Sequence, residues 1–251
     1  MKKGFRILKF KKDRPIFEVK DISKSFDGRP ILKKLSIKVF PGECVGVLGP
    51  NGCGKTTLFS MCIGEQNPES GKIYLNNKAI DQIPIHLRSN EGLGYLPQQR
   101  SVFNLSTYDN IFGICQLYFK DLAKQKAITE KLLDEFNLQH LRSLNASVLS
   151  GGEVRRVMLA RLMINKPKIV LLDEPLAALD PQIIQDIQKY ILKIQASGTA
   201  ILITDHNVRN LFDITDRSYV ISEGNVIAEG TSRELLKSSK AIEHYFGSQF
   251  S

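Results

Sequence analysis

The chain has 251 residues, enough for one large hydrophobic core or two small ones. Apolar residues make up 42% of it, and no apolar run approaches the length of a membrane-spanning helix. The four cysteines form no C-x-x-C pair, and the basic first residues are not followed by the apolar segment of a signal peptide. These features exclude a disulfide-stabilised secreted fold and a zinc ribbon, and we expect a cytoplasmic protein with reduced thiols.

Much of the net charge of +9 lies at the N-terminus, where residues 1–15 contain seven basic residues against Asp13 alone. Four apolar side chains lie among these charges: Phe5, Ile7, Leu8 and Phe10. Such a segment can lie on an anionic membrane, touch nucleic acid or remain a solvated tail, and the sequence leaves these three alternatives open. No internal repeat is present, so we divide the chain into a basic arm (residues 1–15) and one domain (residues 16–250).

Strand patterns fill residues 16–40 and are clearest in residues 35–39, where apolar and polar side chains alternate. Asp27 and Gly28 form a turn signal between two of these strands, and residues 71–75 make a further strand. We expect these strands to form an antiparallel layer beside the main core.

A phosphate-binding pattern follows the buried strand expected at residues 44–48. It fits G-x-x-x-x-G-K-[ST] and precedes a helix expected at residues 56–63, which stops at Gly64. The backbone N–H groups of such a loop point at an anion, its lysine reaches the β- and γ-phosphates, and its threonine hydroxyl holds Mg²⁺. The sequence therefore predicts that the chain binds a nucleoside triphosphate through Gly49, Pro50, Asn51, Gly52, Cys53, Gly54, Lys55, Thr56 and Thr57.

Residues 98–166 have mainly helical patterns, the clearest at residues 124–136. Within them, Ser150 and Glu153 have the spacing of a helix capping box. The same position would leave the amides of Gly151 and Gly152 free at a helix N-terminus, which makes a second anion site. Two copies arranged head to tail could then close both sites on ATP.

Strands and helices alternate after residue 168. A strand at residues 169–172 ends in Asp173 and Glu174, Asp180 and Pro181 start a helix, and a second strand covers residues 200–203. A hairpin turning at Glu223 and Gly224 closes the chain. Alternation of this kind predicts an α/β fold with a mostly parallel sheet.

The motifs together resemble those of ABC (ATP-binding cassette) ATPases. The run Leu149-Ser150-Gly151-Gly152-Glu153 matches the family signature. Gln98, Asp173-Glu174, Asp180 and His206 match, in order, the Q-loop, the Walker B acids, the D-loop and the H-loop, and Phe26 stands where the family stacks an aromatic ring on adenine. The resemblance covers about residues 16–250. It implies a RecA-like P-loop NTPase core with an antiparallel β layer and a helical subdomain inserted at about residues 98–166.

The resemblance also implies a role for each of these residues. Asp173, Thr56 and Gln98 would hold Mg²⁺, Glu174 would polarise the attacking water, and His206 would contact the γ-phosphate, with Gln98 also touching the water. The remaining nucleotide contacts would come from Phe26 and Asp180 and, across a homodimer formed with ATP, from Ser150, Gly151 and Gly152 of the second copy.

Residues 94–110, 203–209 and 230–250 are most similar to the ATP-binding subunits of lipopolysaccharide exporters. This resemblance implies a motor on the inner face of the inner membrane, beneath integral subunits of the LptF/LptG kind. The chain departs from the pattern after Phe103, where Asn104 alone stands in place of two basic residues and the segment is one residue shorter, and at Val154, where a basic residue is commoner. The alternatives are the ATPase of a branched-chain amino-acid importer and a soluble ABC ATPase that acts on nucleic acid. Because tandem cassettes and coiled-coil insertions are absent, no nucleic-acid partner is expected.

The apolar side chains after Gln98 are candidates for contact with such a membrane partner. Val102, Phe103 and Leu105 lie in an expected loop beside polar residues. The alternative is that Phe103 packs inside its own helical subdomain.

Overall fold

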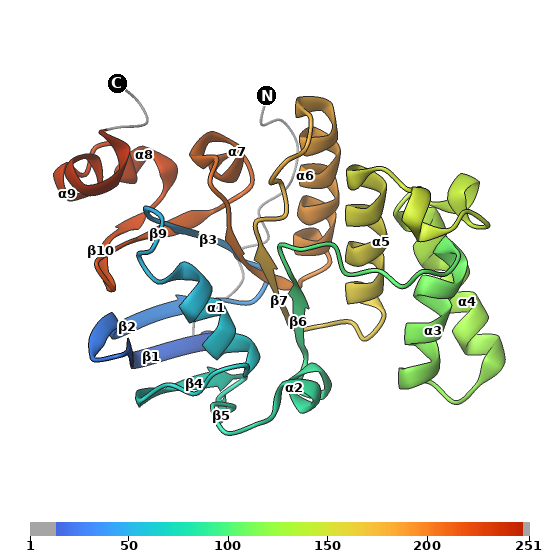
Figure 1. Ribbon diagram of the computed structural model, residues 1–251, viewed down its shortest axis with the longest axis horizontal. Helices are drawn as coiled ribbons and strands as arrows, with labels where there is room; N and C mark the ends of the chain where they lie inside the picture. The colour runs from blue at the N-terminus through green and yellow to red at the C-terminus, as the bar shows by residue number, and fades with distance from the viewer. Residues whose placement is uncertain (1–13, 248–251) are drawn as a thin grey trace.

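The computed structural model describes residues 14–247 (Figure 1). All but the last two residues of the basic arm expected over residues 1–15 lie outside this range. Between residues 14 and 247, no helix has both the length and the apolar character that a membrane span requires.

An antiparallel sheet forms the N-terminal layer, with the strand order β2-β1-β4-β5. Its strands are β1 (Phe17–Phe26), β2 (Arg29–Val39), β4 (Ser70–Leu75) and β5 (Lys78–Ala79). Asp27 and Gly28 have φ angles of 48° and 76°, so both adopt the left-handed backbone of a tight hairpin turn between β1 and β2. The predicted antiparallel layer is therefore confirmed.

The central sheet has the strand order β10-β9-β3-β8-β7-β6. Its strands are β3 (Cys44–Leu48), β6 (Leu93–Leu96), β7 (Ile169–Asp173), β8 (Ala200–Thr204), β9 (Arg217–Ser222) and β10 (Asn225–Gly230). All neighbours pair in parallel except β10, which returns antiparallel from β9. Every residue of β3, β7 and β8 is buried, which explains why these strands are apolar except for the last residues of β7 and β8, Asp173 and Thr204.

Two hydrophobic clusters lie on the two faces of the central sheet. One includes Phe59 and Met61 of α1 (Lys55–Ile63) and the buried residues of the antiparallel sheet. The other includes Ile187 and Ile191 of α6 (Pro181–Ala196) and continues into the helices that follow β6. Asp180 is the N-cap residue of α6 and Pro181 its first residue, as predicted, but the Asp180 side chain makes no capping hydrogen bond.

Three helices stand beside the sheets in Figure 1 and pack on one another: α3 (Thr107–Tyr118), α4 (Leu122–Glu135) and α5 (Gly151–Met163). The sequence places the start of α4 two residues too late. The helix begins at Leu122 because Asp121 Oδ1 accepts the N–H of Lys124 at 2.6 Å. The shorter helices are α2 (Ile85–Glu91), α7 (Val208–Phe212), α8 (Ser232–Leu235) and α9 (Ser239–Ala241), with a π-helical turn at Ile242–Phe246.

Candidate nucleotide-binding site

The phosphate loop joins β3 to α1, as the sequence predicts. Gly54 has a φ of 108°, and a Cβ added there would stand 2.5 Å from Leu32 Cδ2, so no larger residue fits without displacement. Thr56 is exposed in the first turn of α1, where helix N–H groups lack intrahelical acceptors. The loop therefore presents backbone donors and a hydroxyl at the positive end of a helix, which is the geometry that anions prefer.

Lys55 is folded beneath this loop and is only 8% exposed. Its Nζ donates hydrogen bonds to the carbonyl oxygens of Gly49, at 2.7 Å, and Pro50, at 3.0 Å. Cys53 Sγ lies 3.9 Å from the same nitrogen, and burial raises the pKa of the Cys53 thiol. The buried Lys55 ammonium group therefore lies under the phosphate loop, and Lys55 is one of the residues predicted to hold phosphates.

The acid pair lies where the sequence predicts it, at the carboxyl end of β7. Asp173 is 7% exposed, and its Oδ2 accepts a hydrogen bond from the Tyr95 hydroxyl at 3.4 Å. Burial, and then the negative charge of Glu174, raise the pKa of the Asp173 carboxyl. Glu174 itself has a φ of 48°, a strained value for a non-glycine residue that is common at functional sites.

Glu174 brings two further predicted residues together. Gln98 Nε2 donates to Glu174 Oε2 at 2.6 Å, and His206 Nε2 lies 2.6 Å from Glu174 Oε1. Each of the two carboxylate oxygens of Glu174 therefore has its own partner, from loops at the ends of two different strands, β6 and β8.

Two residues that the sequence analysis did not single out hold these loops in place. The Arg155 guanidinium, on α5, donates to the carbonyl oxygens of Pro97 and Gln98 at 3.1 and 3.3 Å. Asp205 is 3% exposed and accepts the N–H groups of Leu176 and Asn207. Asp205 precedes His206 in the sequence, and this position could have identified it as a candidate. No sequence feature links Arg155 to the Gln98 loop.

The signature residues stand apart from the phosphate loop, at the N-terminus of α5. Ser150 and Glu153 form the predicted capping box, with Ser150 N and Oγ donating to Glu153 Oε2 at 2.8 and 2.7 Å. These hydrogen bonds lower the pKa of Glu153. Gly152 packs against α6, since a Cβ there would lie 2.5 Å from Ile183 Cγ2. Ser150 and Gly151 are exposed.

Two more predicted contacts lie on the surface. Phe26, at the end of β1, is 42% exposed and has Lys24 Nζ 5.6 Å from its ring centroid. Asp180 is exposed at the start of α6. Both positions leave the side chain accessible to a nucleotide or to a second protein chain.

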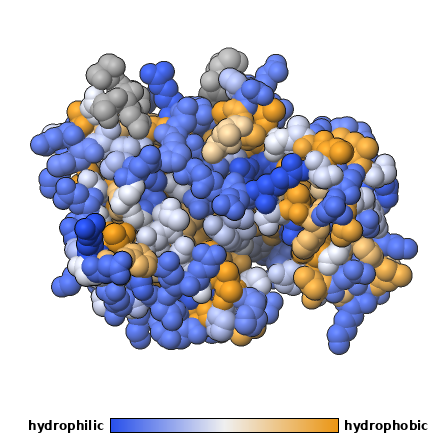
Figure 2. Space-filling view, in the orientation of Figure 1, coloured by the Kyte–Doolittle hydropathy of each residue, from blue (hydrophilic) through white to orange (hydrophobic). Residues whose placement is uncertain are grey.

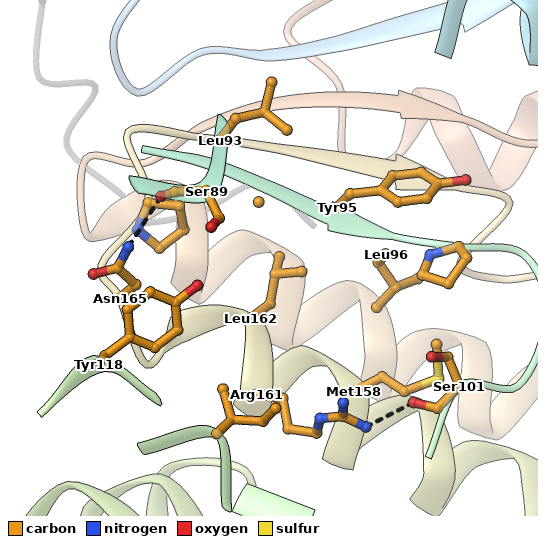
Figure 3. A pocket seen from close by; sticks show the side chains of 14 residues that line it. Ser89, Leu93, Tyr95, Leu96, Ser101, Tyr118, Met158, Arg161, Leu162 and Asn165 are labelled. Atoms are coloured by element: carbon orange, nitrogen blue, oxygen red, sulfur yellow. Dashed lines mark hydrogen bonds between the residues drawn. The ribbon is translucent and has the colours of Figure 1, made fainter. Parts of the chain in front are cut away.

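A pocket of about 230 Å³ is lined by residues of β6 and α5 and lies beside the Gln98 loop (Figure 3). Its lining includes Tyr95, Leu162 and Ser101, and Arg161 donates to the Ser101 carbonyl at 2.7 Å. Phe103 lies just beyond Ser101 and is 49% exposed, with the Arg161 guanidinium 4.6 Å from its ring centroid. Its aromatic ring is therefore not part of the buried core of the helical region.

Comparisons with known proteins agree with this geometry. The family model described as ABC transporter matches residues 32–177. The chain is 41% identical over 233 residues to the lipopolysaccharide export system ATP-binding protein LptB of Escherichia coli, covering 92% of this chain and 97% of that protein. It is 40% identical over 238 residues to the LptB of Haemophilus influenzae, covering 94% and 98%.

Solved structures give the same result. An ATP-binding cassette of an ABC transporter in its ADP conformation is 29% identical, with a TM-score of 0.81 over 93% of this chain and 99% of that one. The cbiO1 protein of Clostridium perfringens, part of the ABC transporter complex cbiONQ, is 28% identical, with a TM-score of 0.83 over 94% and 96%. The chain therefore belongs to the ABC transporter family, as a nucleotide-binding ATPase.

Proposed function

We propose that the chain is the ATP-hydrolysing motor of a lipopolysaccharide export complex on the inner face of the inner membrane. The observation that carries this proposal is its similarity to LptB, at 41% identity over nearly the whole length of both chains. The partners would be integral membrane subunits of the LptF/LptG kind.

The phosphate loop would hold the triphosphate of ATP. We infer that Lys55 Nζ leaves the Gly49 and Pro50 carbonyls for the β- and γ-phosphates, which are stronger acceptors for a cation. The backbone N–H groups of residues 49–57 would bind the remaining phosphate oxygens. Phe26, exposed at the end of β1, would stack on the adenine ring.

The residues beside the loop suit a Mg²⁺ ion. The donor set is the Thr56 hydroxyl, the Asp173 carboxylate and the amide oxygen of Gln98, all of them hard oxygen ligands. The raised pKa of Asp173, caused by burial and by Glu174, supports the fit, since a nearby divalent cation would stabilise its ionised form. When bound, the ion would neutralise charge on the transferring phosphoryl group.

Glu174 would be the general base for the attacking water. Its two carboxylate oxygens are held by Gln98 and His206, so these two residues would orient the base and respond to the γ-phosphate beside it. We infer that His206 turns to the γ-phosphate, and Gln98 to the ion and water, when nucleotide binds.

A second copy of the chain would complete each site. Ser150, Gly151 and Gly152 stand at the N-terminus of a 13-residue helix, and Ser150 and Gly151 are exposed. Asp180 is exposed at the start of α6. In a head-to-tail homodimer these residues would close on the ATP of the other copy, so ATP binding would stabilise the dimer and hydrolysis would weaken it.

The pocket beside Phe103 would receive the membrane partner. The segment from Gln98 to Phe103 is bound to α5 by Arg155 and Arg161, so displacement of this segment would move α5 and the signature residues with it. We infer that the partner inserts a short helix against Phe103.

Affinity purification of the chain from detergent-solubilised membranes, followed by mass spectrometry, tests the proposal. We expect two integral membrane proteins to co-purify, and depletion of the chain to leave lipopolysaccharide in the inner membrane. Recovery of amino-acid permease subunits would support the importer alternative instead. Salt-dependent binding of RNA or DNA by the purified chain, with no membrane partner, would support the nucleic-acid alternative.

A further inference from the structure

The tip between α3 and α4 exposes more apolar surface than a solvated helix end requires. Leu117, in the last turn of α3, is 77% exposed, the highest value of any large apolar residue in the described chain. Leu122, the first residue of α4, is 54% exposed. We refer to residues 117–126, which include both leucines, as the α3–α4 tip.

Basic side chains surround these leucines. Lys120, Lys124 and Lys126 are all exposed, and the one acidic residue of the α3–α4 tip is Asp121. Its Oδ1 is engaged as the cap of α4, where it accepts the N–H of Lys124. The α3–α4 tip therefore exposes two leucine side chains and three lysine ammonium groups to solvent.

The α3–α4 tip is held in place by hydrogen bonds and a cation–π contact among its own residues. The buried side chain of Gln125 donates from Nε2 to the Phe119 carbonyl at 2.6 Å, and the backbone carbonyl of Gln125 accepts from Thr129 Oγ1 at 2.9 Å. Lys124 Nζ lies 4.4 Å from the centroid of the Phe119 ring. These contacts hold the turn between α3 and α4 in one conformation. The turn is therefore ordered by its own contacts, although Leu117 and Leu122 are exposed.

The α3–α4 tip lies next to the pocket and on the same edge of the molecule as further exposed apolar side chains. Tyr118 lines the pocket together with Ser89 of α2. In Figure 1, α2 and the α3–α4 tip lie along the same lower edge of the molecule. Helix α2 also exposes two apolar side chains, Ile85 (46%) and Leu87 (44%). Figure 2 shows apolar side chains among hydrophilic ones over the helical region at this edge.

We propose that the α3–α4 tip is a membrane-surface contact, which seats Leu117 and Leu122 among the headgroups of a bilayer rich in anionic lipid. Charge complementarity selects this occupant, because exposed lysines interspersed with exposed leucines match an anionic interface. The inference rests on the proposed place of the chain beneath a membrane complex. The contact adds a second attachment that is independent of the membrane subunits.

Vesicle flotation of the purified full chain, without membrane subunits, tests the proposal. The probe is phosphatidylcholine vesicles with and without phosphatidylglycerol, at low and high salt. We expect the chain to float with the anionic vesicles, and the combined variant Lys120→Gln, Lys124→Gln, Lys126→Gln to bind them at least about tenfold more weakly. The variant Leu117→Ser, Leu122→Ser should lose the binding that persists at high salt.

The matched control lies on α6, which offers an exposed leucine between two exposed lysines. The variant Lys189→Gln, Leu192→Ser, Lys193→Gln removes two exposed lysines and one exposed leucine away from the α3–α4 tip. It should bind vesicles as the parent chain does. ATPase rates of all variants should equal that of the parent, because none of the substituted residues belongs to the predicted nucleotide site, and melting temperatures check that each variant is folded.

Equal vesicle binding by the tip variants and the parent would overturn the proposal, as would an equal loss in the α6 control. Failure of the parent chain to bind anionic vesicles would also overturn it. If the tip variants instead lose only their membrane subunits on co-purification, the tip is a protein contact. Since vesicle binding needs no partner, its result stands whether or not those partners export lipopolysaccharide.

Discussion

At the residue scale, Glu174 is the point where three separately predicted motifs meet. The sequence places Gln98, Glu174 and His206 at the ends of strands, and parallel strands bring such ends to one edge of a sheet. What the sequence could not give is that both oxygens of one carboxylate are taken, each at 2.6 Å. That pairing depends on rotamers and on the left-handed backbone of Glu174, which no local pattern encodes.

We expect Glu174→Gln to retain ATP binding and to lower ATP turnover by roughly 10²–10⁴-fold, because the amide fills the same space but cannot accept a proton. ATP should then hold the variant as a stable dimer, measured by size-exclusion chromatography. Glu135→Gln, at an exposed carboxylate on α4, is the control and should turn over normally. Near-normal hydrolysis by Glu174→Gln would remove this residue from the proposed mechanism.

Arg88 carries a structural role that composition does not indicate. It is 1% exposed, and its guanidinium donates to four backbone carbonyl oxygens at 2.7–3.0 Å: Met61, Cys62, Asp81 and Ile83. Two of these carbonyls close the C-terminal end of α1, the helix that begins at the phosphate loop. Arg88 therefore joins α1 to α2.

We expect Arg88→Leu to lower the free energy of unfolding by roughly 3 kcal/mol, because it leaves several buried carbonyls unpaired. Urea denaturation measures the change. Arg142→Leu breaks a half-exposed pair with Glu130 and should cost less than about 1 kcal/mol. If the two variants lose equal stability, the buried hydrogen bonds of Arg88 are not what holds α1 to α2.

At the element scale, the fully buried strands and the most amphipathic helices could be predicted, whereas the short strands β5 and β6 and the short helix α2 could not. The strands β3, β7 and β8 have continuous apolar sequences because both their faces are covered, and α6 has a clear apolar stripe. Helix α2 spans only seven residues, begins after Pro84 without a side-chain cap, and buries a single residue, Arg88. Because α2 has no buried apolar face, its sequence lacks the helical periodicity of apolar residues on which such a prediction depends.

Phe103 belongs to this scale, because its position depends on how the loop after β6 meets α3 and α5. Asn110 fixes its backbone by accepting the Phe103 N–H at 2.8 Å and donating to its carbonyl at 3.0 Å. Arg161 covers one face of the ring, which leaves the rest available to a partner. The alternative that this ring belongs to the core is not supported by its 49% exposure.

We expect Phe103→Ala to remain folded and to hydrolyse ATP, but to lose co-purification with the membrane subunits, because an anchoring aromatic contributes roughly 2 kcal/mol or more. Leu192→Ala, at a similarly exposed position on α6, should assemble normally. A large fall in melting temperature would favour the core alternative. Unchanged assembly together with unchanged stability would contradict both.

At the scale of the whole molecule, the sequence predicted the architecture well because the order of its motifs determines the order of its elements. The strands of the two sheets interleave in the chain, since β3 of the central sheet lies between β2 and β4 of the antiparallel sheet, and the helical region is inserted between β6 and β7. The surface chemistry was harder to predict. The exposure of Leu117 and Leu122 follows from the packing of α3 on α4, whereas the sequence alone gives apolar residues at the ends of two helices.

The last prediction concerns the basic arm, most of which lies outside the described residues. Deletion of residues 1–14 removes seven basic residues and one acidic residue, and each basic residue near an anionic surface contributes at most about 1 kcal/mol, screened by salt. We expect the truncated chain to keep its ATPase rate and to bind anionic vesicles more weakly at low salt. Since the arm and the α3–α4 tip are separate segments, the losses from truncation and from the tip lysine variant should add in free energy. Equal vesicle binding by the truncated and full chains at low salt would leave the arm as a solvated tail, with the α3–α4 tip as the remaining membrane contact.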